Sequence, residues 1–404
     1  MKIGIYGGTF NPIHTGHMAA AKFAVEYLQL DLLYLIPAGL PPHKALAENT
    51  PEAEHRLQMT QLAAGAIGKN VKALDVELRR TGKSYTVDTL RELHAWHPQD
   101  ELYFFMGTDM FLTFHKWYQP EEIAKLCTIC AFGRSEADTE ELFAIQREYL
   151  HRTLGANVIT LVLPKIVEIS STQLRDCLQQ GGGAEFLHPA VYGYILREGL
   201  YGTQCDLKQL NLRQLRCVAC SLLKPSRVPH VLGTEEMAAR LAVRWGVDEE
   251  EARRAALLHD CTKLFSREQH DAFCRLNGIE LDAVEQQEEK LLHAKTGAAL
   301  AAQMFGVSNA IREAIQFHTT GKADMTTLQK IIYLADYIEP TRDFDGLTEL
   351  RALAMENLDA AMLQSFTMAV ENLERKGGVV HPNSVHARDF LREQIQGANG
   401  QFAQ

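Results

Sequence analysis

The sequence predicts an α/β domain built on a parallel, doubly wound sheet, followed by an all-α domain. The chain has 404 residues and a mass of 45.3 kDa, which is more than one hydrophobic core usually serves. Its first 200 residues alternate short apolar runs with helical patterns, as expected for a parallel sheet. From Leu207 onward only helical patterns appear, so the second domain is expected to be all-α.

Six apolar runs are expected to form the strands of the sheet. They are Lys2–Tyr6, Leu32–Ile36, Val71–Leu78, Leu102–Met106, Thr128–Phe132 and Val158–Leu163. Stretches such as HMAAAKFAVEYL lie between them, with apolar residues at three-and-four spacing that indicates amphipathic helices. The same spacing continues in the second half, for example in EEMAARLAVRW and LQKIIYLADYI. We expect domains at residues 1–202 and 206–392, joined by a short connection.

Charge and hydropathy exclude two classes of protein. The net charge is -10, and residues 1–202 carry 18 basic and 23 acidic side chains, so neither half is basic. A protein that coats nucleic acid through charge alone is therefore excluded, whereas small anionic ligands are not. No apolar run approaches the roughly 18–20 residues of a membrane-spanning helix, and the opening MKIGIYGG lacks a signal-peptide core. We expect a cytoplasmic protein with no membrane partner.

Two cysteine pairs have CxxC spacing, Cys127/Cys130 and Cys217/Cys220. Each could form half of a zinc site or a redox pair. The first pair lies in a strand-like run, where residues three apart point to opposite faces. The second lies in a helical pattern, where cysteine is a common small apolar residue. We interpret both pairs as core packing in a reducing compartment.

A glycine turn follows the first strand in the segment GGTFNPIHTGH. Gly7 and Gly8 allow a tight turn at the carboxyl end of the strand, where open parallel sheets bind ligands. His14 and His17 lie at the start of the next helix, whose amides and dipole favour an anion. Two imidazoles at this spacing can contact successive phosphates of a nucleoside triphosphate. The alternative is that both histidines are ordinary turn and cap residues.

Residues 1–201 resemble bacterial nicotinate-nucleotide adenylyltransferases in seven motifs. These are GGTFNPIHTGH, IPAGLPPHK, RTGKSYTVDTL, FFMGTDMF, KWY, FGR and EISSTQLR. The resemblance implies a Rossmann-like nucleotidyltransferase domain that transfers the adenylyl group of ATP, accompanied by Mg²⁺, to nicotinate mononucleotide. Asn11 departs from the family pattern, in which many members carry aspartate. The phosphate motifs also fit phosphopantetheine adenylyltransferases and cytidylyltransferases, and nicotinamide mononucleotide is an alternative substrate.

The resemblance also implies roles for individual residues. The catalytic residues are His14, His17, Lys44 and Arg175. The expected ATP-binding residues are Gly7, Gly8, Thr9, Phe10, His14, His17, Ser170, Ser171, Thr172 and Arg175. The expected nicotinate-nucleotide-binding residues are Lys44, Thr86, Asp109, Trp117, Tyr118 and Arg134. In this set Trp117 can stack on the pyridine ring and Asp109 can accept a hydrogen bond from a ribose hydroxyl. Lys44 could instead be a solvated loop lysine, and Arg134 part of a structural ion pair.

An ordered series of histidines and aspartates marks the helical half. Its members are His230, His259, Asp260, His293, His318 and Asp336, each at the end of an apolar helical run. Such residues can ligate a metal, and there are enough of them for two metals with Asp260 as a bridge. The alternative is that they are scattered surface or core histidines. His270, His381 and His386 lie in polar stretches, and we expect them to be solvated.

The helical half resembles HD-domain hydrolases that cleave diadenosine tetraphosphate symmetrically to two ADP. The motifs are VPHVLGTEEMAARLA, ALLHDCTK, LLHAKTGA, AIQFHTTG and IIYLADYIEPTR. The resemblance implies an all-α HD domain in which the six residues hold a dinuclear metal site, with iron as the expected metal. Lys263 and Arg342 are the implied phosphate contacts, with surface ion pairs as the alternative.

Two other readings of the helical half stay open. It could be a nucleotidase or phosphodiesterase of another nucleotide, or a non-catalytic sensing or dimerising module. The partners expected for the whole chain are ATP, nicotinate mononucleotide and diadenosine tetraphosphate, with no nucleic acid and no membrane. A homo-oligomer is a further alternative that the sequence leaves open.

Overall fold

The computed structural model describes residues 1–40, 47–48, 50–133, 140–163 and 169–401. The chain divides into two compact units, Met1–Gln204 and Cys205–Gln404. No helix among the described residues is long and apolar enough to span a membrane.

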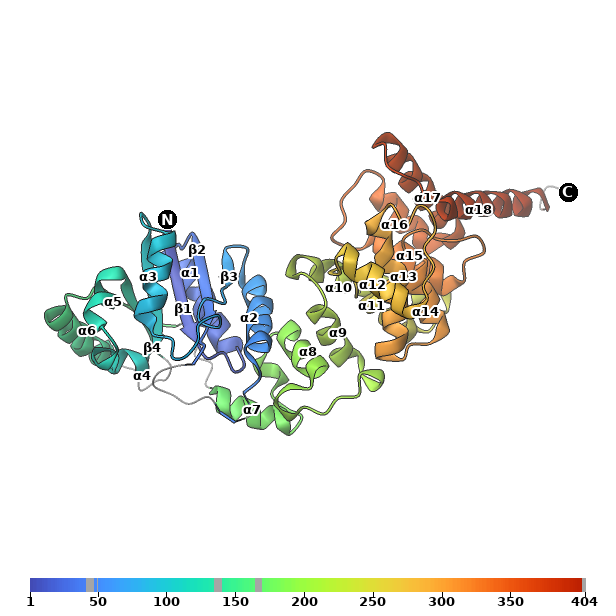
Figure 1. Ribbon diagram of the computed structural model, residues 1–404. Coiled ribbons are helices and arrows are strands. Elements are labelled where there is room, and N and C mark those ends of the chain that lie inside the picture. The colour runs from blue at the N-terminus through green and yellow to red at the C-terminus, as the bar shows by residue number, and fades with distance from the viewer. Residues whose placement is uncertain (41–46, 49, 134–139, 164–168, 402–404) are drawn as a thin grey trace. The chain divides into compact units, whose positions relative to one another are not determined.

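The first unit is built on a six-stranded sheet in which every described pairing is parallel (Figure 1). The strands are β1 (Lys2–Gly8), β2 (Leu32–Pro37), β3 (Val71–Ala73), β4 (Glu101–Gly107), β5 (Thr128–Phe132) and β6 (Val158–Leu161). Their order in the sheet is β3-β2-β1-β4-β5-β6. This confirms the predicted doubly wound fold. The chain switches direction across the sheet between β1 and β4, which is where open parallel sheets bind their ligands.

Helices cover both faces of this sheet, so the strands pack into two cores. The helices are α1 (Thr15–Leu28), α2 (Ala53–Ile67), α3 (Thr86–Trp96), α4 (Thr108–Leu112), α5 (Pro120–Leu126), α6 (Glu140–Leu154), α7 (Ser171–Gln179) and α8 (Pro189–Glu198). One core joins α1, α2, α7 and α8 to the sheet, and the other joins α3, α4, α5 and α6. Along β2, Leu33 and Leu35 enter the first core, whereas Tyr34 and Ile36 enter the second. This alternation follows from the two-residue period of a strand.

The third strand is shorter than the sequence indicates. The run Val71–Leu78 is apolar enough to suggest one strand, but only Val71–Ala73 pairs with β2. At Asp75 the chain turns, because the amide of Leu78 donates to the Asp75 carbonyl at 2.9 Å. Val76 is nevertheless buried in this turn, which explains why the apolar pattern continues beyond the end of the strand.

The cysteines of the first CxxC pair lie on opposite faces of the sheet. Cys127 belongs to the core on the α3 side, and Cys130 belongs to the core on the α1 side. Both thiols are free and buried, and burial raises the pKa of Cys127. Cys217 and Cys220 lie on a helix, α9 (Leu212–Ser221), and are also free. The interpretation of these residues as core packing agrees with this placement.

The second unit consists of helices. They are α9, α10 (Val228–Trp245), α11 (Glu249–Leu258), α12 (Arg267–Asn277), α13 (Glu289–Phe305), α14 (Asn309–Gln316), α15 (Thr327–Ile338), α16 (Leu347–Glu356), α17 (Leu358–Arg375) and α18 (Pro382–Gln401). No strand occurs among its described residues, 205–401, which confirms the predicted all-α domain. Helix α10 packs against α11 and α15, and α13 against α14 (Figure 1). This packing brings the ends of these five helices together at the predicted cluster.

Candidate functional site

The loop between β1 and α1 turns tightly around Phe10. Phe10 has a φ of 44°, a left-handed conformation, and the Asn11–Pro12 peptide bond that follows is cis. A Cβ atom on Gly8 would lie 2.9 Å from the ring of Phe10, so the chain requires glycine there. The predicted glycine turn is therefore present, at the carboxyl end of β1 beside the switch point of the sheet.

His14 and His17 form a reciprocal cap at the start of α1. The Nδ1 atom of His14 accepts from the amide of Gly16 at 3.2 Å, and Nδ1 of His17 accepts from the amide of His14 at 3.3 Å. Their ring centroids lie 3.8 Å apart. A neutral imidazole that accepts at Nδ1 carries its proton on Nε2. The cap therefore fixes both rings in a tautomer whose Nε2–H can donate to an anion, so the cap and ligand interpretations are compatible.

Two arginines hold the carbonyl groups of this loop. Arg175 of α7 donates to the carbonyl of Asn11 at 2.8 Å and to Oγ1 of Thr172 at 3.1 Å. Arg56 of α2 is buried and donates to the carbonyls of Thr9 and Ala38, at 3.0 and 2.7 Å. The loop thus turns its carbonyls toward cations. Arg175 was predicted at this site; Arg56 was missed, because a lone arginine in a helical pattern reads as a surface residue.

Helix α7 starts beside the same loop. Ser170 is its N-cap and accepts from the amide of Gln173 at 3.2 Å, while Gln173 accepts in return from the amide of Ser170 at 3.0 Å. Ser171 and Thr172 follow in the first turn. The hydrogen bond from Arg175 to Asn11 links this helix start to the glycine loop. The two predicted phosphate motifs therefore meet, although these two residues lie 164 positions apart in the sequence.

A second group of predicted residues lies at the carboxyl ends of β4 and β5. Asp109 is exposed in α4, directly after β4, and its neighbour Thr108 donates to the carbonyl of Phe132 at 3.1 Å. Trp117 packs edge-on against Phe104 of β4, with centroids 6.1 Å apart.

Thr86 and Tyr118 belong to the same group. Thr86 opens α3, and its neighbour Tyr85 packs against the exposed ring of Tyr118 with centroids 4.7 Å apart. Two further predicted residues, Lys44 and Arg134, lie outside the described residues.

The histidines and aspartates of the helical unit converge on one point. His230 comes from α10, His293 from α13 and Asp336 from α15, while His259 and Asp260 directly follow α11 and His318 follows α14. Ligand atoms of three overlapping groups lie within 4.8 Å of one another: His230, His259 and Asp260; His259, His318 and Asp336; and Asp260, His293 and His318. The predicted set of six is therefore one cluster.

The shortest contacts divide the cluster into two parts around Asp260. Nε2 of His230 lies 3.0 Å from Oδ1 of Asp336 and 3.3 Å from Nε2 of His259. Nε2 of His293 lies 3.1 Å from Nε2 of His318 and 3.2 Å from Oδ1 of Asp260. Oδ1 of Asp260 is buried without a hydrogen-bond partner.

The protonation states suit metal ligands. Nδ1 of His259, His293 and His318 each contacts a backbone carbonyl three residues earlier, at 2.6 to 2.7 Å. A carbonyl can only accept, so Nδ1 holds the proton and Nε2 faces the cluster as a neutral donor atom. Burial lowers the pKa of His318 to about 3, and it also lowers the pKa of His259.

The two carboxylates of the cluster are held in their ionised form. Burial by itself would raise the pKa of Asp260, but contacts with its neighbours, among them the ammonium group of Lys263, hold it well below its usual range. The pKa of Asp336 is also lowered, against the effect of burial, by the contact with His230. Neutral imidazoles, ionised carboxylates and an unpartnered buried oxygen fit a site for divalent metal ions.

Three cations form the partly exposed rim of this buried cluster. Arg227 contacts Asp260 at 2.6 Å, Lys263 contacts Nε2 of His293 at 3.0 Å, and Arg342 contacts Asp336 at 2.9 Å. Their side chains are 30 to 36% exposed, whereas that of Asp260 is fully buried. Lys263 and Arg342 were predicted. Arg227 was missed, although its position three residues before His230 puts both on one side of a helical turn.

Two histidines that we expected to be solvated are buried. His270 packs inside the unit with Nδ1 3.0 Å from the hydroxyl of Thr296, and burial lowers its pKa to about 4. Buried His381 lies 2.8 Å from Asp282 and accepts from the amide of Asn383 at 3.1 Å. The prediction was wrong because His270 lies on the buried face of the polar helix α12, and His381 is enclosed at the start of α18, where it caps the helix. His386 is exposed, as predicted.

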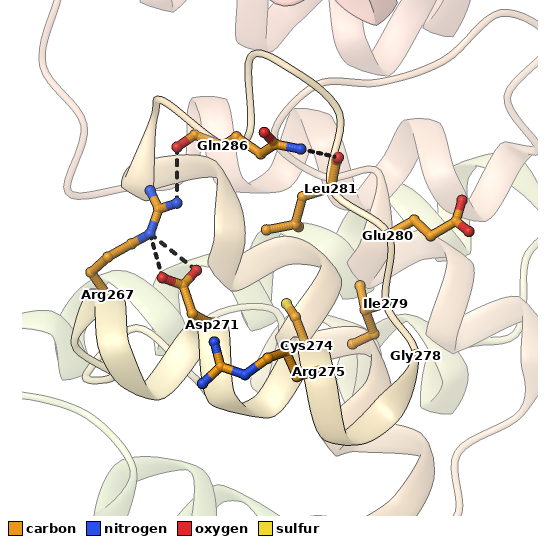
Figure 2. Close-up of a pocket in the computed structure, with 9 residues that line it drawn as sticks. All are labelled: Arg267, Asp271, Cys274, Arg275, Gly278, Ile279, Glu280, Leu281 and Gln286. Carbon is orange, nitrogen blue, oxygen red and sulfur yellow. Dashed lines mark hydrogen bonds and ion pairs between the residues drawn. The ribbon is translucent and has the colours of Figure 1, made fainter.

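Two other polar groupings of the helical unit pair internally. A fourth group of possible metal ligands, Asp282, Glu285 and His381, lies outside the cluster, and there Glu285 is bound by Lys295 at 2.5 Å. Figure 2 shows a pocket beside α12, where Arg267 contacts Asp271 at 3.0 Å and donates to the carbonyl of Gln286 at 2.8 Å. None of the six cluster residues lines this pocket. We therefore place the chemistry of the unit at the cluster.

Comparison with known families agrees with this division. A cytidylyltransferase-like family model matches residues 5–177, and the HD domain model matches residues 227–341. A probable nicotinate-nucleotide adenylyltransferase of Carboxydothermus hydrogenoformans is 38% identical over 201 residues, which are 50% of this chain and 98% of that protein. A probable nicotinate-nucleotide adenylyltransferase of Synechococcus sp. (strain JA-3-3Ab) is 39% identical over 203 residues, which are 50% of this chain and 94% of that protein.

A solved structure is similar in sequence to part of the chain. It is a predicted HD superfamily hydrolase involved in NAD metabolism from Clostridium acetobutylicum, 38% identical, covering 46% of this chain and 98% of its own, with a TM-score of 0.44.

The buried contacts of Arg56 predict a specific loss of stability. Arg56→Met keeps the length of the side chain but leaves the carbonyls of Thr9 and Ala38 without their donor. An unsatisfied buried acceptor costs about 1–3 kcal/mol, so the free energy of unfolding should fall by that amount in denaturant titration. Arg79→Met is the matched control, because Arg79 is 62% exposed. Equal stability of the two variants would contradict the role given to Arg56.

Proposed function

The chain belongs to the nicotinate-nucleotide adenylyltransferase family over its first unit and carries an HD domain in its second, and from this we propose that it is a bifunctional enzyme. In this proposal the first unit makes nicotinate adenine dinucleotide from ATP and nicotinate mononucleotide. The second unit hydrolyses diadenosine tetraphosphate to two ADP. The observation that carries the proposal is that the described residues of each unit form a polar site of their own.

The first reaction needs alignment and charge neutralisation more than acid–base chemistry. A 5′-phosphate oxygen of the mononucleotide attacks the α-phosphorus of ATP, and the bond to the β-phosphate breaks to release pyrophosphate. A phosphate anion needs no base to activate it, so the protein has to hold the two groups in line. Mg²⁺ bound to ATP supplies further positive charge.

We assign the residues of the first unit accordingly. His14 and His17 donate Nε2–H to the triphosphate, together with the glycine loop and the start of α7. Arg175, already tied to that loop at Asn11, adds charge near the leaving pyrophosphate. The nicotinate mononucleotide is proposed to bind beside Asp109, Trp117, Tyr118 and Thr86. Its phosphate is proposed to contact Lys44 and Arg134, which lie outside the described residues. Comparing nicotinate with nicotinamide mononucleotide as substrates tests this side of the site.

The second reaction breaks the central phosphate bridge of a dinucleoside polyphosphate. Water attacks the second or third phosphorus, so that each product leaves with two phosphates. The cluster is proposed to hold two metals, iron in particular, with Asp260 between them; bound there, they supply Lewis acidity toward the phosphoryl group. With metals bound, the partners of the three rim cations would act as metal ligands. The side chains of Arg227, Lys263 and Arg342 would then be available to bind the phosphates of the substrate. Three rim cations favour a polyphosphate over a singly charged cyclic nucleotide.

A substrate panel separates this function from its alternatives. It compares dinucleoside polyphosphates, deoxynucleotides and cyclic nucleotides as substrates of the anaerobically prepared full chain. Preferred hydrolysis of diadenosine tetraphosphate to ADP supports the proposal. Preference for another nucleotide supports the nucleotidase or phosphodiesterase alternative, and a metal-loaded protein without hydrolysis supports a sensing module.

His17→Ala should lower adenylyl transfer about 100- to 1000-fold, the typical cost of one preorganised donor to developing charge. His17→Glu is the matched control for the cap, because glutamate at this helical position still accepts from the amide of His14. It should preserve thermal stability but lose activity at least as strongly, since it places an anion beside the phosphates. A loss below about fivefold in His17→Ala, with normal thermal stability, would reduce His17 to a cap.

Asp260→Ala should remove bound metal and abolish hydrolysis while adenylyl transfer continues at the wild-type rate. His318→Ala should lower the metal content toward one ion per chain, because the shortest contact of His318 in the cluster, 3.1 Å between Nε2 atoms, is with His293 of the second part. Asp282→Ala is the matched control, an aspartate of the same unit that pairs with His381 outside the cluster. Elemental analysis with parallel assays of both activities provides the measurement. Normal hydrolysis by Asp260→Ala would contradict the assignment.

We also propose that residues 1–202 and 206–392 act independently. The two compact units divide at Gln204, and no proposed site draws residues from both, which supports this division. A protein ending at Gln204 should therefore fold and retain adenylyl transfer at a rate within a few-fold of the full chain. Circular dichroism and the transfer assay check this. A folded but inactive fragment would show that the units share a site.

A further inference from the structure

Glu339 is a buried carboxylate directly beside the cluster that the sequence did not single out. It follows α15 and lies three residues after Asp336. Glu339 is 0% exposed, and its Oε1 atom lies 3.0 Å from Nδ1 of His230. Since a carboxylate oxygen only accepts in its ionised form, Nδ1 of His230 holds a proton and Nε2 faces His259 and Asp336.

This arrangement sets His230 apart from the other histidines of the cluster. His259, His293 and His318 each direct Nδ1 to the carbonyl three residues earlier in their own helical segment. His230 instead uses a charged side chain from a different helix. A carboxylate behind an imidazole fixes its orientation and makes its other nitrogen a stronger metal donor than a carbonyl does.

The carboxylate of Glu339 is itself held in place. Its Oε2 accepts from the amide of Thr341 and its Oε1 from the hydroxyl of Thr341, both at 2.6 Å. Arg351 donates to the carbonyls of Ile338 and Glu339 at 2.8 and 2.6 Å, which fixes the turn. On the other side, a Cβ on Gly233 would lie 2.7 Å from Oε2, so glycine leaves the room that Glu339 occupies.

We propose that Glu339 is the positioning residue of the metal centre: it orients His230 and makes the position around His230, His259 and Asp336 the tighter of the two metal positions. This rests on the proposed function, in which the cluster holds two metals. The second position lacks an equivalent carboxylate among the described residues. It also has a cation close by, because Lys263 lies 3.0 Å from Nε2 of His293.

The test uses the full chain and Mn²⁺, whose binding is counted by electron paramagnetic resonance. Glu339→Ala should weaken the tighter Mn²⁺ site about 10- to 100-fold, as loss of an outer partner of a metal ligand does. Glu339→Gln should be intermediate, because the amide oxygen still accepts from Nδ1 but carries no charge. Selective ¹⁵N-histidine spectra of the metal-free protein should show the Nδ1 proton of His230 in the wild type and its loss in Glu339→Ala.

Glu235→Ala is the matched control for a purely structural effect. Glu235 is a buried carboxylate of the same helix as His230, but it pairs with Arg216 and Arg253 and touches no cluster residue. The Glu235→Ala variant should have a lower thermal stability and an unchanged affinity for Mn²⁺. If Glu339→Ala binds Mn²⁺ with wild-type affinity, or if Glu235→Ala weakens binding equally, the role of Glu339 is overturned and the proposed metal centre is not. A wild-type chain that binds no Mn²⁺ would overturn the proposed metal centre together with it.

Discussion

The helical unit depends on placing two ionised carboxylates, the fully buried Asp260 and the partly buried Asp336, among apolar helices. An ionised carboxylate is costly to bury unless nearby groups neutralise it. Here the partners come from separate helices, with His230 from α10, His293 from α13 and Arg227 from the turn before α10. The bundle must therefore close for the cluster to form, and one oxygen of Asp260 still lacks a hydrogen bond. Divalent cations complete such a cluster, which couples metal binding to stability.

The site of the first unit has the opposite electrostatic requirement, because it has to hold anions. It does so with backbone groups, a helix N-terminus and two imidazoles whose caps place the proton on Nε2. Arg56 and Arg175 donate to the carbonyls of Thr9 and Asn11, so these two acceptors of the loop are already bound. An anion site and a cation site within one chain fit two phosphate reactions with different needs: departure of pyrophosphate in one and attack by water in the other.

The sheet and the residues of the cluster were predictable from the sequence, because periodicity indicates secondary structure and motifs indicate which side chains bind ligands. The alternation of strands and helices predicted the sheet, and six residues such as His259 and Asp260 predicted one cluster. The outer partners were missed, since Arg227 and Glu339 act only through contacts with other helices. Their positions three residues from His230 and Asp336 were the available signal. His270 and His381 were misjudged because local polarity does not report which face of a helix is buried.

The central claim is that the six histidines and aspartates form one centre for two metal ions that meet at Asp260. Anomalous diffraction from crystals of the full chain, grown anaerobically with iron, tests it most directly. We expect two iron peaks, one among His230, His259 and Asp336 and one among His293, His318 and Asp260, with Asp260 in contact with both. A cluster that binds no iron, or iron bound instead at Asp282 and His381, would contradict it.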